Sequence, residues 1–253
     1  MTLFMYDNYV GNSTFIYGST AKTGFPSSNL KSPLRTKRWV VANGTGTVVF
    51  AGSTKTEINT ICLAGFDWTS QPSTLEVEMN ATTDFSSPTT TCDLTSLYTA
   101  NPSAYGNQTV IVKKLTTEKY KCYRLKVGHG SSWALGLVYI GPSFQPTNDR
   151  LMDGDSEDMI DPSLISASVD GQEHVDELTG YRTRKFTFLA QTSAQWQKFQ
   201  TMWNNVGIRK DLFVRFSSVA ADYAWYGKFS KAPKISLIPP SYQKIGFQFK
   251  ESR

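Results

Sequence analysis

The 253-residue sequence has few of the residues from which enzymatic and metal centres are usually built. It contains two histidines and three cysteines, and 19% of its residues are charged. His129 and His174 are far apart, no Cys-x-x-Cys spacing occurs, and no Gly-x-Ser-x-Gly elbow or phosphate-binding loop is present. We therefore expect no enzyme and no zinc site, and we expect both histidines on the surface.

Disulfides and membrane-spanning helices are also not indicated. Cys62, Cys92 and Cys122 are an odd number without framework spacing, so we expect them to be buried as small apolar residues. The longest apolar runs, such as 133–140, fall far short of the ~20 residues that a membrane helix needs. Residues 1–11 have neither a basic region nor an apolar core, so we expect no signal peptide and a chain made and kept in the cytoplasm.

The first part of the chain, residues 1–145, has the pattern of many short strands separated by turns. In "TLEVEMN" (74–80) the apolar residues alternate with Glu76 and Glu78, which predicts a strand buried on one face with both glutamates outward. Strands at this spacing predict a β-sandwich. Further apolar, β-branched stretches lie at 47–52, 58–66, 108–115, 119–127 and 133–141.

A second region follows an acidic, proline-containing segment, 146–162, which we interpret as a linker. Residues 163–253 again show alternating strands, with one amphipathic helix predicted over 192–206. Thr192 and Gln195 form a capping box at the start of this helix, and Gly207 suits its end. The overall prediction is a mostly β protein, in which a β-rich second domain carries one helix on its sheet.

Charge is distributed unevenly along the chain. Residues 149–177 hold ten acidic residues and one basic residue, whereas residues 178–253 hold 13 basic and three acidic residues. Opposite patches on one chain favour complementary packing between copies. The candidate intersubunit residues are Asp153, Asp155, Glu157, Asp158, Arg182, Arg184 and Lys185.

Stretches in both halves of the sequence resemble known families. The first-half stretches "SSNLKSPLRTKRWVV", "INTICLAGFDW" and "KYKCYRLKVG" resemble a discoidin-type, galactose-binding-like jelly roll. The second-half stretches "WQKFQTMWNNVGIRKDLFVRFSS" and "IGFQFKE" resemble the distal-tail or tail-tube-like domain of bacteriophage tails. Together they resemble structural proteins of phage tail tips and baseplates, of the distal-tail type, with the order of the two domains reversed relative to the usual arrangement.

The basic stretch 27–44 bears on ligand binding. Trp39 is followed by two valines, which predicts a buried strand, so the preceding basic residues lie in a loop at one end of the sandwich. Discoidin-type domains bind ligands at such loops, whereas nucleic-acid binding would need more interleaved aromatics or a basic recognition helix. The candidate ligand-loop residues are Lys31, Arg35, Lys37, Trp68 and Tyr105.

The acidic cluster between Asp149 and Asp161 does not match the spacing of an EF-hand loop. We therefore expect no cofactor. A structural Ca²⁺ remains open, because the resemblance to discoidin-type domains implies one near the sandwich edge.

The resemblance implies a structural role in a phage tail tip or baseplate, with the chain made in the cytoplasm of the host bacterium and located in the virion tail. Its implied partners are copies of itself in a ring, other tail proteins and a host-surface glycan, with no membrane insertion. The alternative function is a stand-alone carbohydrate-binding or receptor-binding module.

Overall fold

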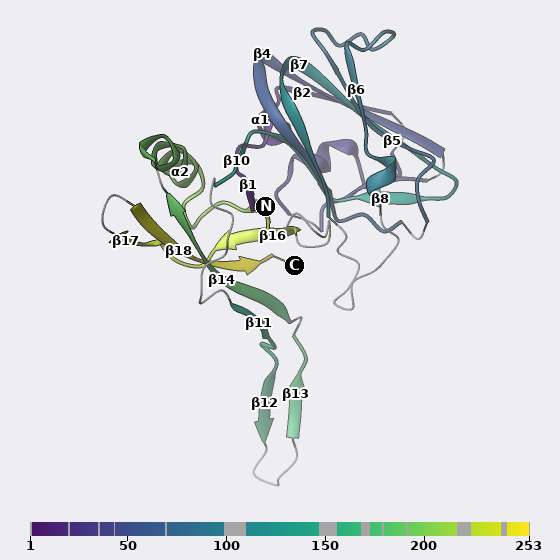
Figure 1. Ribbon diagram of the computed structural model, residues 1–253. Helices are drawn as coiled ribbons and strands as arrows, with labels where there is room; N and C mark the ends of the chain where they lie inside the picture. The colour runs from purple at the N-terminus through teal and green to yellow at the C-terminus, as the bar shows by residue number, and fades with distance from the viewer. Residues whose placement is uncertain are drawn as a thin grey trace. The chain divides into compact units, whose positions relative to one another are not determined.

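A computed structural model shows that the chain is mostly β, as predicted, and that it divides into two compact units (Figure 1). The sandwich unit comprises Phe4–Ser143 and Arg215–Ala224, and the helix unit comprises Met1–Leu3, Phe144–Val214 and Trp225–Arg253. The structure describes residues 2–19, 21–34, 36–42, 44–68, 70–98, 110–146, 156–167, 173–178, 180–190, 192–216, 224–238 and 242–252.

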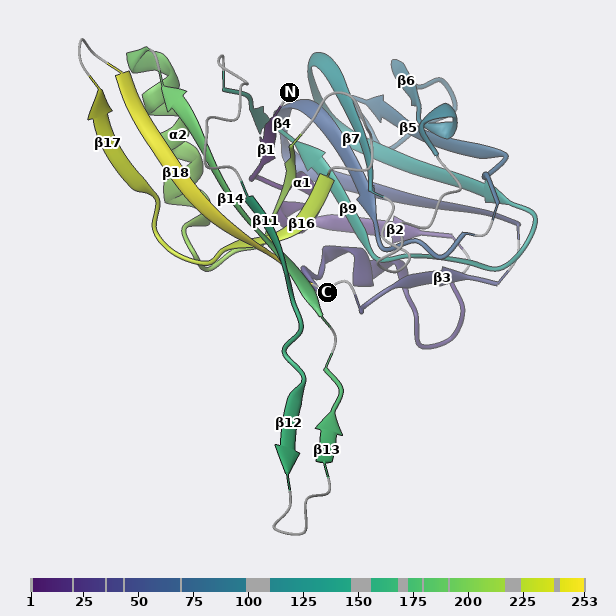
Figure 2. The same ribbon diagram turned by 60° about the horizontal axis from the view of Figure 1, so that its bottom comes forward.

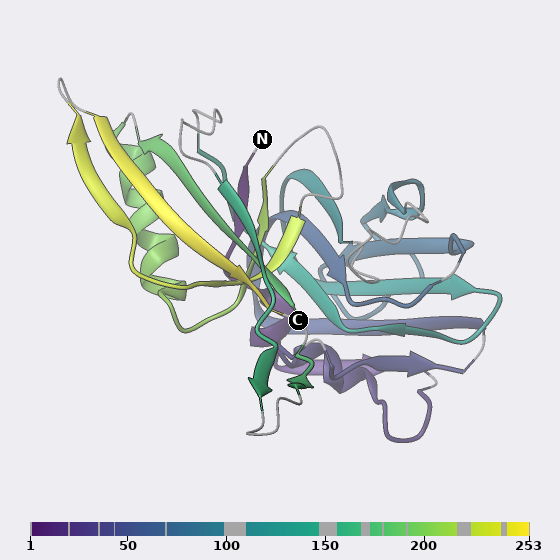
Figure 3. The ribbon, with the colours of Figure 1, turned by 90° about the horizontal axis from the view of Figure 1, so that it is seen from below.

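The sandwich unit is built around two long antiparallel strands, β4 (Gly44–Ala64) and β7 (Ile111–His129). Figure 3 shows them running beside one another, in blue and teal. The main sheet has the order β2-β4-β7-β5-β6, β9 pairs with β4, and β3 pairs with β8 in a second, two-stranded sheet. The remaining elements are α1 (Tyr9–Asn12), β2 (Phe15–Gly18), η1 (Ser27–Lys31), β3 (Trp39–Val41), β5 (Thr74–Asn80), β6 (Thr90–Asp93), η2 (Thr95–Leu97), β8 (Trp133–Leu135) and β9 (Leu137–Gly141).

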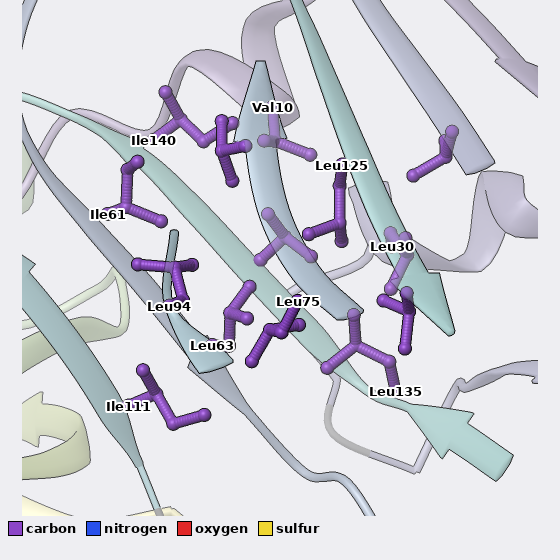
Figure 4. Packing of buried hydrophobic residues seen from close by; sticks show 14 of the residues in the cluster. Val10, Leu30, Ile61, Leu63, Leu75, Leu94, Ile111, Leu125, Leu135 and Ile140 are labelled. Atoms are coloured by element: carbon purple, nitrogen blue, oxygen red, sulfur yellow. The ribbon is translucent and has the colours of Figure 1, made fainter. Parts of the chain in front are cut away.

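The core of this unit is aliphatic and aromatic, and Figure 4 shows part of it. Trp39 is fully buried and packs edge-on against Trp133 at 4.8 Å between ring centroids, which confirms the predicted buried strand. The three cysteines are free and buried, as predicted. Burial raises the pKa of the Cys62 thiol well above its usual value, which disfavours the reactive thiolate form.

Strand β5 follows the predicted alternation except at one position. Leu75, Val77 and Met79 are buried as expected, but Glu78 is also buried, so the prediction that it faces outward is wrong. Its carboxylate is paired with Arg124 on the neighbouring strand β7. A buried carboxylate is tolerated because this cation and its hydrogen bond compensate for the lost hydration.

The helix unit contains a sheet with the order β15-β16-β18-β14-β11, and β17 pairs with β18. Its strands are β11 (Ser156–Ile160), β12 (Leu164–Ala167), β13 (Glu173–Asp176), β14 (Tyr181–Ala190), β15 (Leu212–Arg215), β16 (Ala224–Phe229), β17 (Lys234–Ile238) and β18 (Tyr242–Glu251). Two short strands, β1 (Leu3–Met5) and β10 (Ser143–Phe144), lie where the chain passes from one unit to the other. The range predicted as a linker, 146–162, is therefore partly a strand, because β11 pairs with β14 over its whole length.

Helix α2 (Ser193–Val206) begins and ends close to the predicted residues. The Thr192 side chain accepts a hydrogen bond from the Gln195 backbone at 3.2 Å, and Gly207 takes the left-handed backbone conformation, with φ of 54°, that ends the helix. Phe199 is buried and contacts Phe188 of β14 and Phe247 of β18. No helix among the described residues is long and apolar enough to span a membrane.

Candidate functional site

The register of the sandwich brings several strand ends together. Gly44 at the start of β4 pairs with His129 at the end of β7, and Thr74 at the start of β5 pairs with Gly128. The segments before β5 and after β7 therefore lie at one end of the sandwich, and the contacts of Asp67 with Arg38 and with the Ala134 backbone bring 36–38 and 65–68 to the same end. We call this the loop end, and it comprises residues 36–38, 65–68, 70–73 and 129–133.

Aromatic rings form the base of the loop end. Trp68 stacks on Phe66 with 4.5 Å between ring centroids, and Tyr98 and Trp133 complete the cluster. The Tyr98 hydroxyl donates to the Trp68 carbonyl at 2.8 Å, which fixes the backbone above the rings. Trp68 is only 8% exposed, so this candidate ligand-loop residue supports the loop from below and offers little ring surface to solvent.

An ion pair lies at the surface above this base. Arg38 Nη1 is 4.0 Å from Asp67 Oδ2, and both side chains are a little under half exposed. The other carboxylate oxygen of Asp67 accepts from the Ala134 backbone at 2.7 Å, and the Asn29 amide donates to the Arg38 carbonyl at 2.8 Å. These bonds fix the Asp67 carboxylate and the Arg38 backbone, while both charged groups still reach solvent.

His129 links two loops of this end, and the prediction that it lies on the surface is wrong. Its ring is buried, with Nε2 3.1 Å from Ser70 Oγ and Nδ1 3.2 Å from the Ser131 backbone nitrogen. A backbone N–H can only donate, so Nδ1 is the acceptor and the neutral ring carries its proton on Nε2. The side chain of His174 lies outside the described residues.

The contact between Ser70 and His129 is not a catalytic pair. A general base must accept the serine proton, but Nε2 already carries a proton and donates. No carboxylate occupies the position beside Nδ1 that would favour the opposite tautomer, because the Ser131 backbone is there. The arrangement positions the two loops and does not activate Ser70.

The other candidate ligand-loop residues have different surroundings. Lys31 is exposed, but its Nζ donates to the Ser13 carbonyl at 2.7 Å and so holds the loop to the N-terminal segment. Lys37 is exposed, one residue from Arg38. Arg35 and Tyr105 lie outside the described residues.

The sequence analysis did not select Asp67 or Phe25 as site residues. Asp67 lies between two aromatic residues that both point into the core, and this alternation is a signal that could have identified it as outward-facing. Phe25, 43% exposed, is held beside β3 by a hydrogen bond from the Val40 backbone to its carbonyl. The sequence alone does not distinguish an exposed phenylalanine from a buried one, so the exposure of Phe25 becomes clear only in the fold.

The candidate intersubunit charges of the helix unit form pairs within the chain. Arg182 binds Glu251 through two hydrogen bonds, of 3.0 and 2.8 Å, and Glu251 is 2% exposed. Glu157 lies 4.0 Å from Arg182 and 3.7 Å from Arg184. Lys185 and Asp158 form a half-exposed pair at 4.0 Å. Asp153 and Asp155 lie outside the described residues.

Within the parts of the chain that the structure describes, no group of three or more His, Cys, Asp or Glu side chains is arranged to hold a metal ion. Of the acidic cluster considered for Ca²⁺, Glu157 and Asp158 form ion pairs with Arg184 and Lys185, and Asp161 is also described. Asp149, Asp153 and Asp155 fall outside the described parts, so the Ca²⁺ hypothesis stays a prediction.

No protein-family model matches the chain, and no curated protein matches it. Among solved structures, it is similar to chitosan-binding module 1 of a chitosanase/glucanase from Paenibacillus sp. IK-5, with a TM-score of 0.40, 18% identity, and coverage of 53% of this chain and 98% of that chain. It is also similar to a fucose binding module of Streptococcus pneumoniae, with a TM-score of 0.42, 8% identity, and coverage of 54% and 95%. Likeness at this level does not carry a ligand over to this chain.

Proposed function

We propose that the chain is a binding protein without catalytic activity and that the loop end of its sandwich unit binds a carbohydrate. The observation that carries this proposal is the surface pair of Arg38 and Asp67 above a stacked aromatic base. A guanidinium that donates beside a carboxylate that accepts suits two neighbouring sugar hydroxyls, each of which can donate and accept. The resemblance of the first half to galactose-binding-like domains supports the same ligand class.

The pair is already positioned before a ligand arrives. Asp67 is held by the Ala134 backbone, and the Arg38 backbone is held by Asn29, so the loop entropy lost on binding is small. His129 and its bonds to the loops of Ser70 and Ser131 serve the same purpose. A sugar would also gain from stacking on an exposed ring. We assign this role to Phe25, whose carbonyl accepts from the backbone of Val40, two residues from Arg38.

Calorimetric titration of the protein with a panel of neutral and acidic oligosaccharides tests this proposal. Asp67→Asn and Arg38→Ala should each weaken binding by about tenfold or more, because each removes a charged hydrogen-bond partner worth ~1.5 to 3 kcal/mol. The matched control is Lys119→Ala, which removes an exposed ion pair with Glu57, at 3.0 Å, elsewhere in the sandwich. No binding by the wild type, or equal binding by all three variants, would overturn the proposal.

A second candidate function is that of a structural subunit of a bacteriophage tail tip, made in the cytoplasm of the host bacterium. It is supported by the resemblance of the second half to distal-tail proteins and by the hairpin of β12 and β13. This hairpin extends away from the sheet of the helix unit beyond β11 and β14 (Figure 1), and it exposes Leu164 and Leu178 at its base. A projecting hairpin with exposed leucines suits insertion against a neighbouring protein.

Labelling of phage particles with an antibody against this chain, followed by electron microscopy, tests the second candidate. Label at the tail tip is the expected result. Particles that lack the chain, or label on the capsid alone, would overturn it without affecting carbohydrate binding by the purified protein.

A further inference from the structure

The helix unit contains four consecutive antiparallel strands whose two outer edges are unpaired among the described residues. The order is β17-β18-β14-β11, and each neighbouring pair is antiparallel (Figure 2). Strand β16 pairs with the other end of β18, at Phe249–Glu251. An unpaired edge presents a row of backbone donors and acceptors that can pair with another strand. The two edges belong to one sheet and differ in chemistry.

The β17 edge has an apolar face and a basic face. Ile235 is opposite Ile245, which is opposite Phe188, and Phe188 contacts Phe199 of helix α2. Ile235 and Leu237, two residues apart, therefore lie on the face that the helix covers. The helix does not reach them, since they are 47% and 79% exposed. Lys234 lies on the opposite face.

The β11 edge also has an apolar face, but its other face is acidic. Met159 is opposite Arg182, which lies on the same face of β14 as Phe186 and Phe188. Met159 is therefore also on the helix-covered face, and it is 60% exposed. Asp158 lies on the opposite face with a half-exposed carboxylate, whose Lys185 partner is 4.0 Å away.

We propose that β11 of a second copy pairs with β17, so that the sheet continues from copy to copy in a head-to-tail arrangement. With an even number of antiparallel strands, β17 and β11 run in opposite directions. A copy placed with its helix on the same side therefore presents β11 antiparallel to β17. Met159 then lies beside Ile235 and Leu237 on one face, and Asp158 lies beside Lys234 on the other.

This pairing uses two different surfaces of each copy, so it closes into a ring or extends into a filament. Pairing of β17 with another β17 would bring two lysines to the joined edges without a carboxylate, whereas pairing with β11 places Asp158 beside Lys234. The proposal rests on the second candidate function, that of a structural subunit of a tail tip. It identifies the partner as a second copy of the chain and the strands that meet as β11 and β17. It does not depend on carbohydrate binding.

Two variants, each with one disabled edge, test the proposal. The β17 variant carries Ile235→Lys and Leu237→Lys, and the β11 variant carries Asp158→Lys and Met159→Lys. Sedimentation velocity should show a concentration-dependent oligomer for the wild type and a monomer for each variant alone. An equimolar mixture should give a 1:1 dimer that grows no further, because it contains one intact β17 edge and one intact β11 edge.

The control is Ile208→Lys, which places the same charge at a residue that is 50% exposed in the same unit but not on a strand edge. It should assemble like the wild type, and all variants should keep the wild-type circular dichroism spectrum and thermal midpoint. A monomeric wild type at millimolar concentration, a β11 variant that still dimerises, or a mixture that stays monomeric would overturn the proposal. Label at the tail tip together with any of these results would reject the strand pairing and leave the tail function standing.

Discussion

Strands β6 and β17 each lie at an edge of a sheet, one in each unit, and they differ in what they expose. Strand β6, "TTCD", is four residues long, and its one apolar side chain, Cys92, is buried. Strand β17, "KISLI", exposes Ile235 and Leu237. Short polar edges resist pairing with other chains, whereas exposed apolar edges favour it. The β6 edge of the sandwich unit therefore resists pairing, while the β17 edge of the helix unit favours a neighbouring strand.

The largest expected effect concerns the core of the sandwich unit. Trp133→Ala should lower the free energy of unfolding by about 3 to 5 kcal/mol, because the ring is 1% exposed and its loss leaves a cavity beside Trp39. Denaturant unfolding measures this, with Leu34→Ala, at a residue that is 54% exposed, as the control. Equal stability of both variants would mean that the core depends on contacts from outside the unit.

The next prediction separates structural charges from assembly charges in the helix unit. Arg182→Ala should cost roughly 3 kcal/mol of unfolding free energy, because it removes two charge-assisted hydrogen bonds from the buried Glu251 carboxylate. Lys185→Ala should change stability by less than about 1 kcal/mol, since its pair with Asp158 is half exposed.

Thermal and denaturant unfolding of the two variants provide the measurement. Similar losses of unfolding free energy in both variants would contradict the distinction between structural and assembly charges. Because Arg182 holds the fold, reversing it to Glu would unfold the helix unit and could not report on contacts between copies. Lys185 and Asp158 are the suitable positions for such a test.

A smaller effect is expected on helix α2. Trp203 is partly exposed and contacts Phe229 at 5.7 Å, whereas Phe199 is buried against two strands. Trp203→Ala should therefore cost about 1 to 2 kcal/mol, less than the roughly 3 kcal/mol expected for Phe199→Ala. Chemical denaturation of both variants checks the order. A larger cost at Trp203 would mean that its ring is covered in solution, for instance by a second copy.

Features set by neighbouring residues could be predicted from the sequence. The ends of helix α2 depend on Thr192 and Gly207, and the burial of Trp39 follows from the two valines beside it. These signals lie within a few residues of the feature that they determine.

Features set by distant pairing could not be predicted. Glu78 is buried because β7 places Arg124 beside it, and β11 is a strand because β14 pairs with it. The pair of Arg38 and Asp67 likewise joins two loops that are distant in the sequence. Alternation shows which residues share a face, but the register between strands decides which residues meet.

The difference between the two edge strands is tested most directly by backbone hydrogen exchange of the whole chain at low and at high protein concentration. We predict that the amides on the open edges of β17 and β11 exchange fast in dilute protein and become protected together as concentration rises, while those on the open edge of β6 do not change. Protection that does not change with concentration at β17 and β11, or that increases at β6 instead, would contradict the account.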